Sequence, residues 1–289
     1  MKMLFSIILL FINHLAVGSD NSIVVTKIND SMYKLYVSDY VYMYTFSGPD
    51  GTLLIDTGYE VEENILKQKL IELGAADLKY IVNTHSNADH IGGNQYFHNA
   101  VIIAHTRCRE YLLTKPDFPK EGLPNLTFSD QLTLRFNSEE IRLIAMPGAH
   151  TSDDIMLYFV NQNLVFLGDI IVADSFPVIW LDYYKDVGIN KLVANLEQII
   201  RIFPDDAIFI SSHGRDYTES DLKEYYKMVT ETILIVKKAI DEGKTLEQIL
   251  KENVLKDYRF YDNERFDFIN ADFWIETIYK DYTKKAEQF

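Results

Sequence analysis

The sequence predicts a mixed α/β (α+β) protein in which helices are layered on β-sheets, followed by a helical C-terminal extension. Between residues 52 and 113, β-branched and aromatic runs of strand length alternate with helical runs, as they do in folds that layer helices on a sheet. From residue 220 onward the apolar periodicity is helical. With 289 residues, 47% of them hydrophobic, the chain can bury a core that needs no disulfide or structural metal.

The individual elements follow from local patterns. Residues 47–51 form a turn that closes a hairpin, Gly74 and Gly243 end helices, and Thr245 with Gln248 resembles a helix capping box. The expected strands are 23–27, 33–37, 40–47, 52–56, 78–83, 100–104, 132–136, 141–145, 155–160, 164–167 and 207–211. The expected helices are a short one after residue 90, then 107–113, 189–203, 222–242, 245–251 and 271–282, with 61–73 preceding them.

The N-terminus has the layout of a secretory signal. Lys2 precedes an apolar run at 4–12, and small residues at 16 and 18 provide a cleavage site. A buried N-terminal strand is the competing interpretation. We therefore expect a signal peptide at 1–18, one domain at 19–217 and a helical extension at 218–289 packed on that domain. After removal of the signal, no membrane association is expected, and the protein should be periplasmic or secreted.

The net charge and the cysteine content narrow the classes of partner and of chemistry that the sequence allows. The net charge of −15, without any compensating Lys/Arg run, argues against a nucleic-acid partner and leaves a small-molecule substrate. Cys108 is the one cysteine, so no intrachain disulfide can form, and we interpret it as a buried structural residue rather than a nucleophile.

Metal-capable side chains gather in four short segments at the ends of predicted strands, several of them beside glycines. Imidazole and carboxylate together suit zinc, iron or manganese better than magnesium or calcium. Any one of these histidines could be an ordinary core residue, but the set together indicates a metal centre. Its members are His85, Asn87, Asp89, His90, His150, Asp169 and His213.

The order of these motifs resembles the metallo-beta-lactamase superfamily. The matching stretches are Leu-Ile-Asp-Thr-Gly at 54–58, Thr-His-x-Asn-x-Asp-His-x-Gly-Gly at 84–93, Pro-Gly-Ala-His at 147–150, Phe-Leu-Gly-Asp at 166–169 and Ser-His at 212–213. The resemblance covers about residues 22 to 217. It implies a four-layer αβ/βα sandwich with a two-metal site along one edge of its sheets.

The resemblance also implies roles for the candidate ligands. His85, Asn87 and His150 would hold one metal, Asp89, His90 and His213 the other, and Asp169 would bridge them. Asn87 stands where the family has histidine, and an amide oxygen is the weaker donor. We therefore expect one tightly bound Zn²⁺ at the second position and a second, weaker one, with iron or manganese as alternatives.

The expected activity is hydrolysis of an ester, thioester, lactone or amide bond, a β-lactam included, by a metal-activated hydroxide. Asp89 is the candidate catalytic residue that orients the water and relays its proton. Two alternatives are a mononuclear-iron redox enzyme of the same fold and a degenerate, non-catalytic binding protein. The expected substrate-binding residues are Tyr40, Tyr42, Phe176 and Trp180, although Trp180 could instead pack against the helix at 189–203.

Overall fold

The computed structural model of the protein describes residues 23–37, 41–60 and 63–286. The predicted signal peptide at 1–18 and the candidate residue Tyr40 lie outside this part of the chain. Among the described helices, none combines the length and apolarity that crossing a membrane requires.

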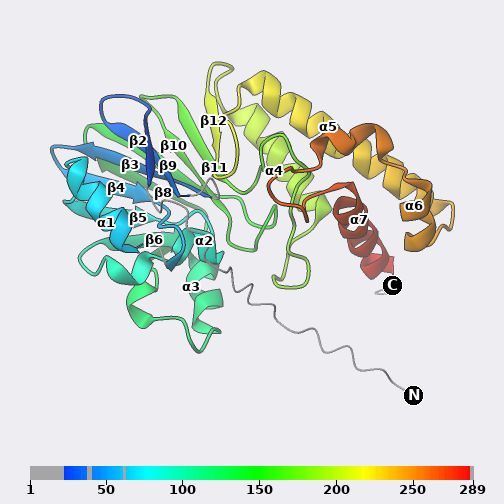
Figure 1. Ribbon diagram of the computed structural model, residues 1–289, viewed down its shortest axis with the longest axis horizontal. Helices are drawn as coiled ribbons and strands as arrows, with labels where there is room; N and C mark the ends of the chain where they lie inside the picture. The colour runs from blue at the N-terminus through cyan, green and yellow to red at the C-terminus, as the bar shows by residue number, and fades with distance from the viewer. Residues whose placement is uncertain (1–22, 38–40, 61–62, 287–289) are drawn as a thin grey trace.

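Two β-sheets lie in the left half of the molecule as Figure 1 shows it. The first has the order β1-β2-β3-β4-β5-β6-β7; its strands pair antiparallel as far as β4 and parallel beyond it. Its strands are β1 (Val24–Lys27), β2 (Met32–Val37), β3 (Val41–Gly48), β4 (Gly51–Ile55), β5 (Leu78–Val82), β6 (Val101–His105) and β7 (Leu126–Phe128).

The second sheet has the order β12-β11-β10-β9-β8, and its one parallel pair is β11 with β12. Its strands are β8 (Gln131–Phe136), β9 (Glu139–Ala145), β10 (Ile155–Phe159), β11 (Leu164–Gly168) and β12 (Ile208–Ser211). The helices are α1 (Glu63–Glu72), α2 (Ala88–Ile91), α3 (Thr106–Leu113), α4 (Ile189–Ile202), α5 (Glu219–Asp241), α6 (Leu246–Glu252) and α7 (Ala271–Ala286), and short 3₁₀ turns lie at Asn94–Tyr96, Lys120–Gly122 and Lys256–Tyr261.

The sheets and helices form four layers. Phe46, Leu53, Leu157 and Phe166 belong to the core between the two sheets. On the outer face of the first sheet, α1 and α3 bury their apolar sides. On the outer face of the second sheet, α4 and α5 do the same. This helix–sheet–sheet–helix order confirms the predicted αβ/βα sandwich.

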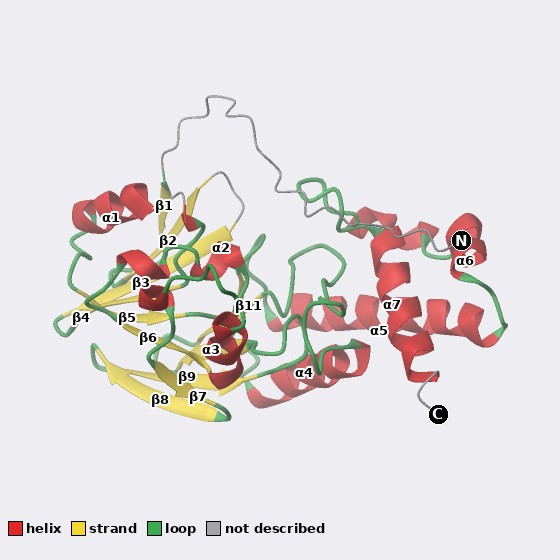
Figure 2. Ribbon diagram, turned by 90° about the horizontal axis from the view of Figure 1, so that it is seen from below, coloured by secondary structure: helices red, strands yellow, loops and turns green. Residues whose placement is uncertain are grey.

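The C-terminal helices extend the layer formed by α4, on the right in Figure 1 and Figure 2. Helix α5 contacts α4, β12 and α7, and α6 contacts α7. Trp274 on α7 is fully buried, and its Nε1 donates a hydrogen bond of 2.9 Å to Oγ1 of Thr232 on α5. These helices therefore share one apolar core with the outer face of the second sheet.

The predicted ends of α1 and α5 and the predicted start of α6 are confirmed, whereas other bounds differ; α7, for example, ends four residues beyond the expected position 282. Gly74 and Gly243 have positive φ angles just past α1 and α5, and Thr245 and Gln248 form the capping box that begins α6. Helix α5 begins three residues earlier than predicted, because Thr218 and Asp221 make a second capping box. Strand β7 was not predicted; it has three residues, too few for an alternating pattern.

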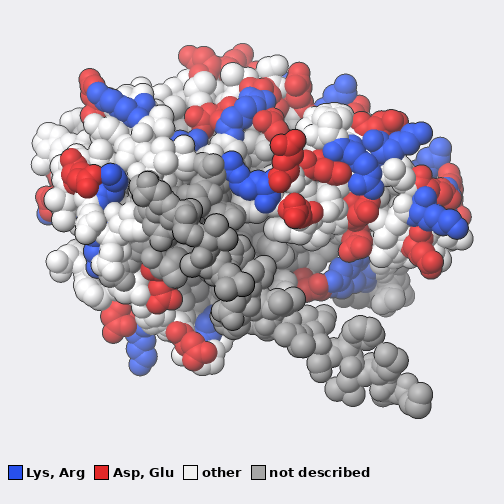
Figure 3. Space-filling view, viewed as in Figure 1, with Lys and Arg blue, Asp and Glu red and all other residues white. Residues whose placement is uncertain are grey.

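Acidic and basic side chains are interspersed over the face shown in Figure 3, most densely over the C-terminal helices. Many of them form surface ion pairs, such as Arg259 with Asp272 and Lys237 with Asp241. Exposed pairs of this kind contribute little to stability.

Candidate metal centre

The candidate ligands come from loops that follow strands at one edge of the sandwich. His85 lies in the loop after β5, His150 between β9 and β10, Asp169 directly after β11, and His213 two residues after the end of β12. Close approach of two of these loops depends on Gly168, whose φ is +56° and whose added Cβ would lie 2.9 Å from Cβ of Thr84. Asn87 precedes α2, whereas Asp89 and His90 lie within it, so the motif presents side chains in two directions.

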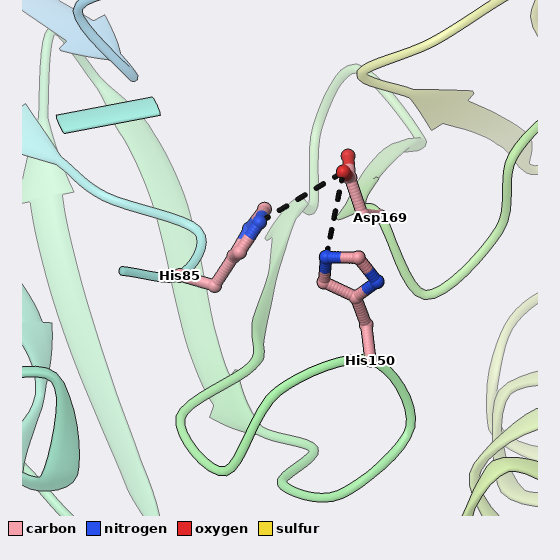
Figure 4. Close-up of side chains that lie close together, drawn as sticks. All are labelled: His85, His150 and Asp169. Carbon is pink, nitrogen blue, oxygen red and sulfur yellow. Dashed lines mark ion pairs between the residues drawn. The ribbon is translucent and has the colours of Figure 1, made fainter. Parts of the chain in front are cut away.

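Asp169 lies at the centre of the cluster. Its Oδ2 is 3.2 Å from Nε2 of His213 and 3.6 Å from Nε2 of His90. The same oxygen is 3.7 Å from Nε2 of His150 and 3.8 Å from Nε2 of His85; Figure 4 shows these two rings pointing toward Asp169. One carboxylate thus faces four imidazoles that come from three different loops and one helix.

The side chains divide into two groups, each able to hold one ion. His85, His150 and Asp169 form the first, and Asp89, His90 and His213 the second, with the ligand atoms of each group within 4.8 Å of one another. Three buried polar atoms in them, Nε2 of His85, Nε2 of His90 and Oδ1 of Asp169, have no hydrogen-bond partner among the described residues. Such atoms are costly to bury unless a ligand satisfies them, so these donors fit a divalent metal.

Further hydrogen bonds fix the outer nitrogens of the histidines. Nδ1 of His90 lies 2.8 Å from Oδ2 of Asp56, and Nδ1 of His150 lies 2.8 Å from the carbonyl oxygen of Val178. Thr84 donates to both carboxylate oxygens of Asp56 at 2.8 Å, and its Oγ1 lies 3.1 Å from Nδ1 of His85. Because carboxylate and carbonyl oxygens only accept, Nδ1 of His90 and of His150 carries a hydrogen, which leaves Nε2 of each ring as the atom that would ligate a metal.

The two groups differ in protonation without a metal. Burial lowers the pKa of His85 well below its usual value and also lowers the pKa of His150, so both rings are neutral at neutral pH. Burial would lower the pKa of His213 too, but Asp169 outweighs it and raises that pKa to about 9. The carboxylates around His90 likewise outweigh burial and raise its pKa well above the usual value.

Both carboxylates of the centre are ionised. Burial alone would raise the pKa of Asp89, but His90 and His213 outweigh it and lower that pKa below the usual range. The same two histidines outweigh burial at Asp169 and lower its pKa. A divalent metal needs its carboxylate ligands ionised, as these are, and its binding would displace the protons that His90 and His213 carry without it.

Asn87 does not present its oxygen to the first group. Its Nδ2 lies 2.9 Å from Nε2 of His150, and its Oδ1 accepts a hydrogen bond of 2.8 Å from the hydroxyl of Tyr184. Because a metal on Nε2 of His150 would take the lone pair that this contact uses, Asn87 as an oxygen ligand stays a prediction. The first group reaches three donors through Asp169 instead.

The expected substrate-binding residues within the described part of the chain differ in their exposure and surroundings. Tyr42 lines a cavity of about 610 Å³ beside His213. The expectation for Phe176 is wrong: its side chain is fully buried, because the apolar segment around it turns into the core. Trp180 is half-buried, and its ring packs 6.2 Å from that of His150 and 6.2 Å from that of Phe268.

A larger cavity of about 790 Å³ was not predicted. It opens on the other side of the motif, where Asn87 and Tyr184 lie in its wall together with Tyr59, Tyr111 and Phe118. Asp56 was also missed as a supporting residue, although its motif was noted. The sequence signal that could have found it was the motif at 54–58; in the structure Asp56 has a φ of 58°, a conformation that aspartate tolerates.

Comparisons with known proteins agree with this geometry. The sequence profile of the metallo-beta-lactamase superfamily matches residues 37–213. Hydroxyacylglutathione hydrolase of Prochlorococcus marinus (strain MIT 9301) is 24% identical over 281 residues, which cover 89% of this chain and 98% of that protein. Metallo-beta-lactamase type 2 of Elizabethkingia meningoseptica is 22% identical over 217 residues, covering 73% of this chain and 83% of that protein.

Solved structures show the same fold. A metallo-beta-lactamase from Pontibacter korlensis superimposes with a TM-score of 0.61 at 20% identity, covering 72% of this chain and 99% of that one. The profile match includes all seven candidate ligands and ends at the last of them, His213. The chain therefore belongs to the metallo-beta-lactamase superfamily, as a metal-dependent hydrolase.

Proposed function

We propose that this protein is a zinc-dependent hydrolase of ester or thioester bonds, with lactones and amides, β-lactams included, as weaker candidates. The observation that carries the proposal is Asp169, whose Oδ2 faces the Nε2 atoms of four histidines at 3.2 to 3.8 Å. Four imidazoles and two carboxylates make a donor set that suits zinc. A relative that covers most of the chain is named for an acylglutathione, whose bond is a thioester.

The candidate ligands would form two metal sites. His85, His150 and Asp169 would hold one ion, and Asp89, His90 and His213 the other. A divalent metal bound there lowers the pKa of bound water toward neutrality and supplies the nucleophile. Asp56, Thr84 and Val178 keep the imidazoles in the orientation and tautomer that ligation needs.

Asp89 is the residue proposed to handle the proton. Its Oδ2 lies 3.5 Å from Nε2 of His90 and 3.5 Å from Nε2 of His213, and its side chain is 19% exposed, more than that of Asp169. This oxygen can orient an attacking water, hold its proton and pass it to the leaving group.

The test is turnover of a substrate panel by the purified protein: a hydroxyacylglutathione, an aryl ester, a lactone and a β-lactam. Hydrolysis of the thioester or ester that stops in a chelator and returns with zinc supports the proposal. Asp169→Ala should abolish it, whereas Asp77→Asn, at an exposed carboxylate paired with Lys79, should not. A zinc-loaded protein that cleaves none of the four would contradict it, and purification with iron would favour the redox alternative.

We also propose that the protein is exported to the periplasm or beyond, with a signal peptide at 1–18. The support is the layout of the first residues, a lysine, an apolar run and small residues before position 19. N-terminal sequencing of the protein purified from its own cells tests this. A mature chain that begins near residue 19 is expected, and a chain that retains Met1 would contradict export.

A further inference from the structure

A loop of the C-terminal extension reaches the metal centre. It spans residues 262–270 and directly precedes α7. The ring of Phe266 in this loop lies 5.4 Å from the imidazole of His213 and stands nearly perpendicular to it, at 88°. The extension, which lies beyond the profile match at 37–213, therefore places an aromatic side chain beside a candidate ligand.

Hydrogen bonds and one apolar side chain hold this loop in place. Nδ2 of Asn263 donates to Oγ of Ser175 at 2.7 Å, and Oδ1 of Asn263 accepts from the backbone N–H of Phe266 at 2.8 Å. Ile269 is buried in the core, and its carbonyl oxygen accepts from the backbone N–H of Asn263 at 2.8 Å. None of these contacts uses a candidate metal ligand, so metal binding at the histidines leaves them intact.

The loop forms part of the wall of the 610 Å³ cavity beside His213. Phe266 lines this cavity, and Tyr42 on β3 and Phe260 line it as well. A cavity of this size accepts a small organic group, and aromatic walls favour an apolar one, a ring in particular.

Cations that line the same cavity are already paired with carboxylates. Arg215 lies 2.9 Å from Asp174, and Nζ of Lys34 lies 3.8 Å from Asp216. An anionic group of a ligand would compete with these carboxylates, whereas an apolar group meets no such competition. The three aromatic rings are therefore the groups that select the occupant.

Exposed aromatic side chains gather around the loop. Phe260 is 73% exposed, Phe268 46% and Tyr183 68%. The rings of Phe268 and Tyr183 lie 6.2 and 5.7 Å from that of Trp180. Apolar side chains scattered singly over a surface are ordinary, but a group of them beside a cavity indicates a ligand-binding surface.

The cavity lies on the side of the centre from which the leaving group would depart. Oδ2 of Asp89, the residue proposed to pass the proton to the leaving atom, is 3.5 Å from Nε2 of His213. Both side chains belong to one ligand group and would hold the same ion, so they stay close when that ion binds. A leaving group in the cavity is therefore next to its proton donor.

We propose that Phe266 is a specificity-determining residue that holds an aromatic or branched apolar leaving group, an alcohol or a thiol, in the cavity beside His213. Asn263 positions its loop. This rests on the proposed hydrolase function. The water oxygen bonds to the carbonyl carbon, the bond from that carbon to the leaving oxygen or sulfur breaks, and the leaving atom takes the proton that the water lost to Asp89.

Two thioesters with the same acyl group isolate the contribution of the ring: S-(2-phenylethyl) thioacetate and S-ethyl thioacetate. The zinc-loaded parent should prefer the first by about 10–100-fold in kcat/KM, the effect of burying one aromatic ring. Phe266→Ala should cut this preference about tenfold by raising KM for the phenylethyl thioester, because the lost contact is the same in the ground state and in the transition state. Its kcat, its zinc per chain and its kcat/KM for the ethyl thioester should stay unchanged.

Three further variants separate the ring from the loop. Phe266→Leu keeps an apolar side chain and should retain most of the preference, whereas Asn263→Ala releases the loop from Ser175 and should weaken it. Phe118→Ala is the matched control. Phe118 is also a half-buried phenylalanine, but it lines the 790 Å³ cavity on the other side of the motif, so its loss should leave the preference unaltered.

Equal kcat/KM for the two thioesters in the parent would overturn the proposal and leave the hydrolase function standing. Loss of the preference in Phe118→Ala rather than in Phe266→Ala would also overturn it, as would a Phe266→Ala variant that loses kcat equally for both thioesters. A ring preference that depends on Phe266 only when the ring is on the acyl group, as in S-ethyl phenylthioacetate, would overturn the assignment to the leaving group. Absence of hydrolysis of any ester or thioester by the zinc-loaded parent would instead refute the hydrolase function itself.

Discussion

The carboxylate of Asp56 accepts a hydrogen bond of 2.8 Å from Nδ1 of His90, and both side chains are fully buried. This contact decides which nitrogen of His90 faces the metal centre. Supporting carboxylates of this kind also make the imidazole more basic and hence a better ligand.

Asp56→Asn is therefore expected to weaken zinc binding about 10–100-fold, the usual cost of losing such a partner. Competition with a chromophoric chelator measures this directly. Asp77→Asn is the control, because that carboxylate is exposed and pairs with Lys79. Equal zinc affinity in Asp56→Asn and in the parent would show that the contact does not support the ligand.

Zinc affinity should rise with pH. In the metal-free protein the pKa of His213 is raised to about 9 and that of His90 is raised well above its usual value, so both rings lose a proton when zinc binds. Below about pH 9, each proton released weakens binding by up to about tenfold per pH unit. Zinc titrations across this range, in buffers that do not bind zinc, measure the slope; an affinity independent of pH would contradict the assigned ligands.

The raised pKa of His213 has the opposite consequence for the stability of the metal-free protein, which should fall as the pH rises. A histidine whose pKa is raised by folding stabilises the native state fully below its unfolded pKa of about 6.5, and this stabilisation is lost as the pH rises toward 9. The chelated protein should therefore melt at a lower temperature near pH 9 than near neutrality. A melting temperature that rises over this interval would contradict the pKa assigned to His213.

Asp89→Asn should reduce kcat about 10²–10⁴-fold, the range associated with general acid–base groups. The amide cannot take a proton from water, although it can still contact His90 and His213. Zinc per chain should be measured alongside, since the substitution also removes a charged ligand from the second group. Retention of kcat at full zinc loading would exclude Asp89 as the proton-handling residue.

Much of the metal centre could be predicted because its ligands follow strands directly. His85, Asp169 and His213 each come a few residues after an apolar run, and the ends of parallel strands meet at one edge of a sheet. The glycines beside them gave further local signals. Their convergence on Asp169 follows from this topology.

Other parts of the site could not be predicted, because no local pattern in the sequence indicates them. Tyr184 lies 97 residues from Asn87, in an irregular segment, so nothing in its surroundings indicated that its hydroxyl would reach the motif. Phe176 was predicted to line a pocket because it follows Asp169, yet its neighbours Val178 and Ile179 are buried with it. Whether an apolar loop residue faces a pocket or the core depends on tertiary packing, which periodicity does not report.

Trp274 tests the packing of the C-terminal helices. Its indole is fully buried and donates to Thr232, so Trp274→Ala should cost about 3–5 kcal/mol of unfolding free energy. Urea denaturation of the zinc-loaded protein measures this change in unfolding free energy. Phe260→Ala is the control, since that ring is 73% exposed and its loss should change stability by less than about 0.5 kcal/mol. Equal effects of the two substitutions would show that α7 does not contribute to the core.

The central claim is that this donor set binds zinc and that the zinc-loaded protein hydrolyses a thioester or ester. The most direct measurement is stepwise addition of zinc to the chelated protein, with bound metal and hydrolysis of a hydroxyacylglutathione or an aryl ester followed in the same samples. Activity that is absent without metal and rises with the first equivalent bound is the predicted result. Zinc that binds without any hydrolysis, or a protein that binds no zinc, would contradict the account.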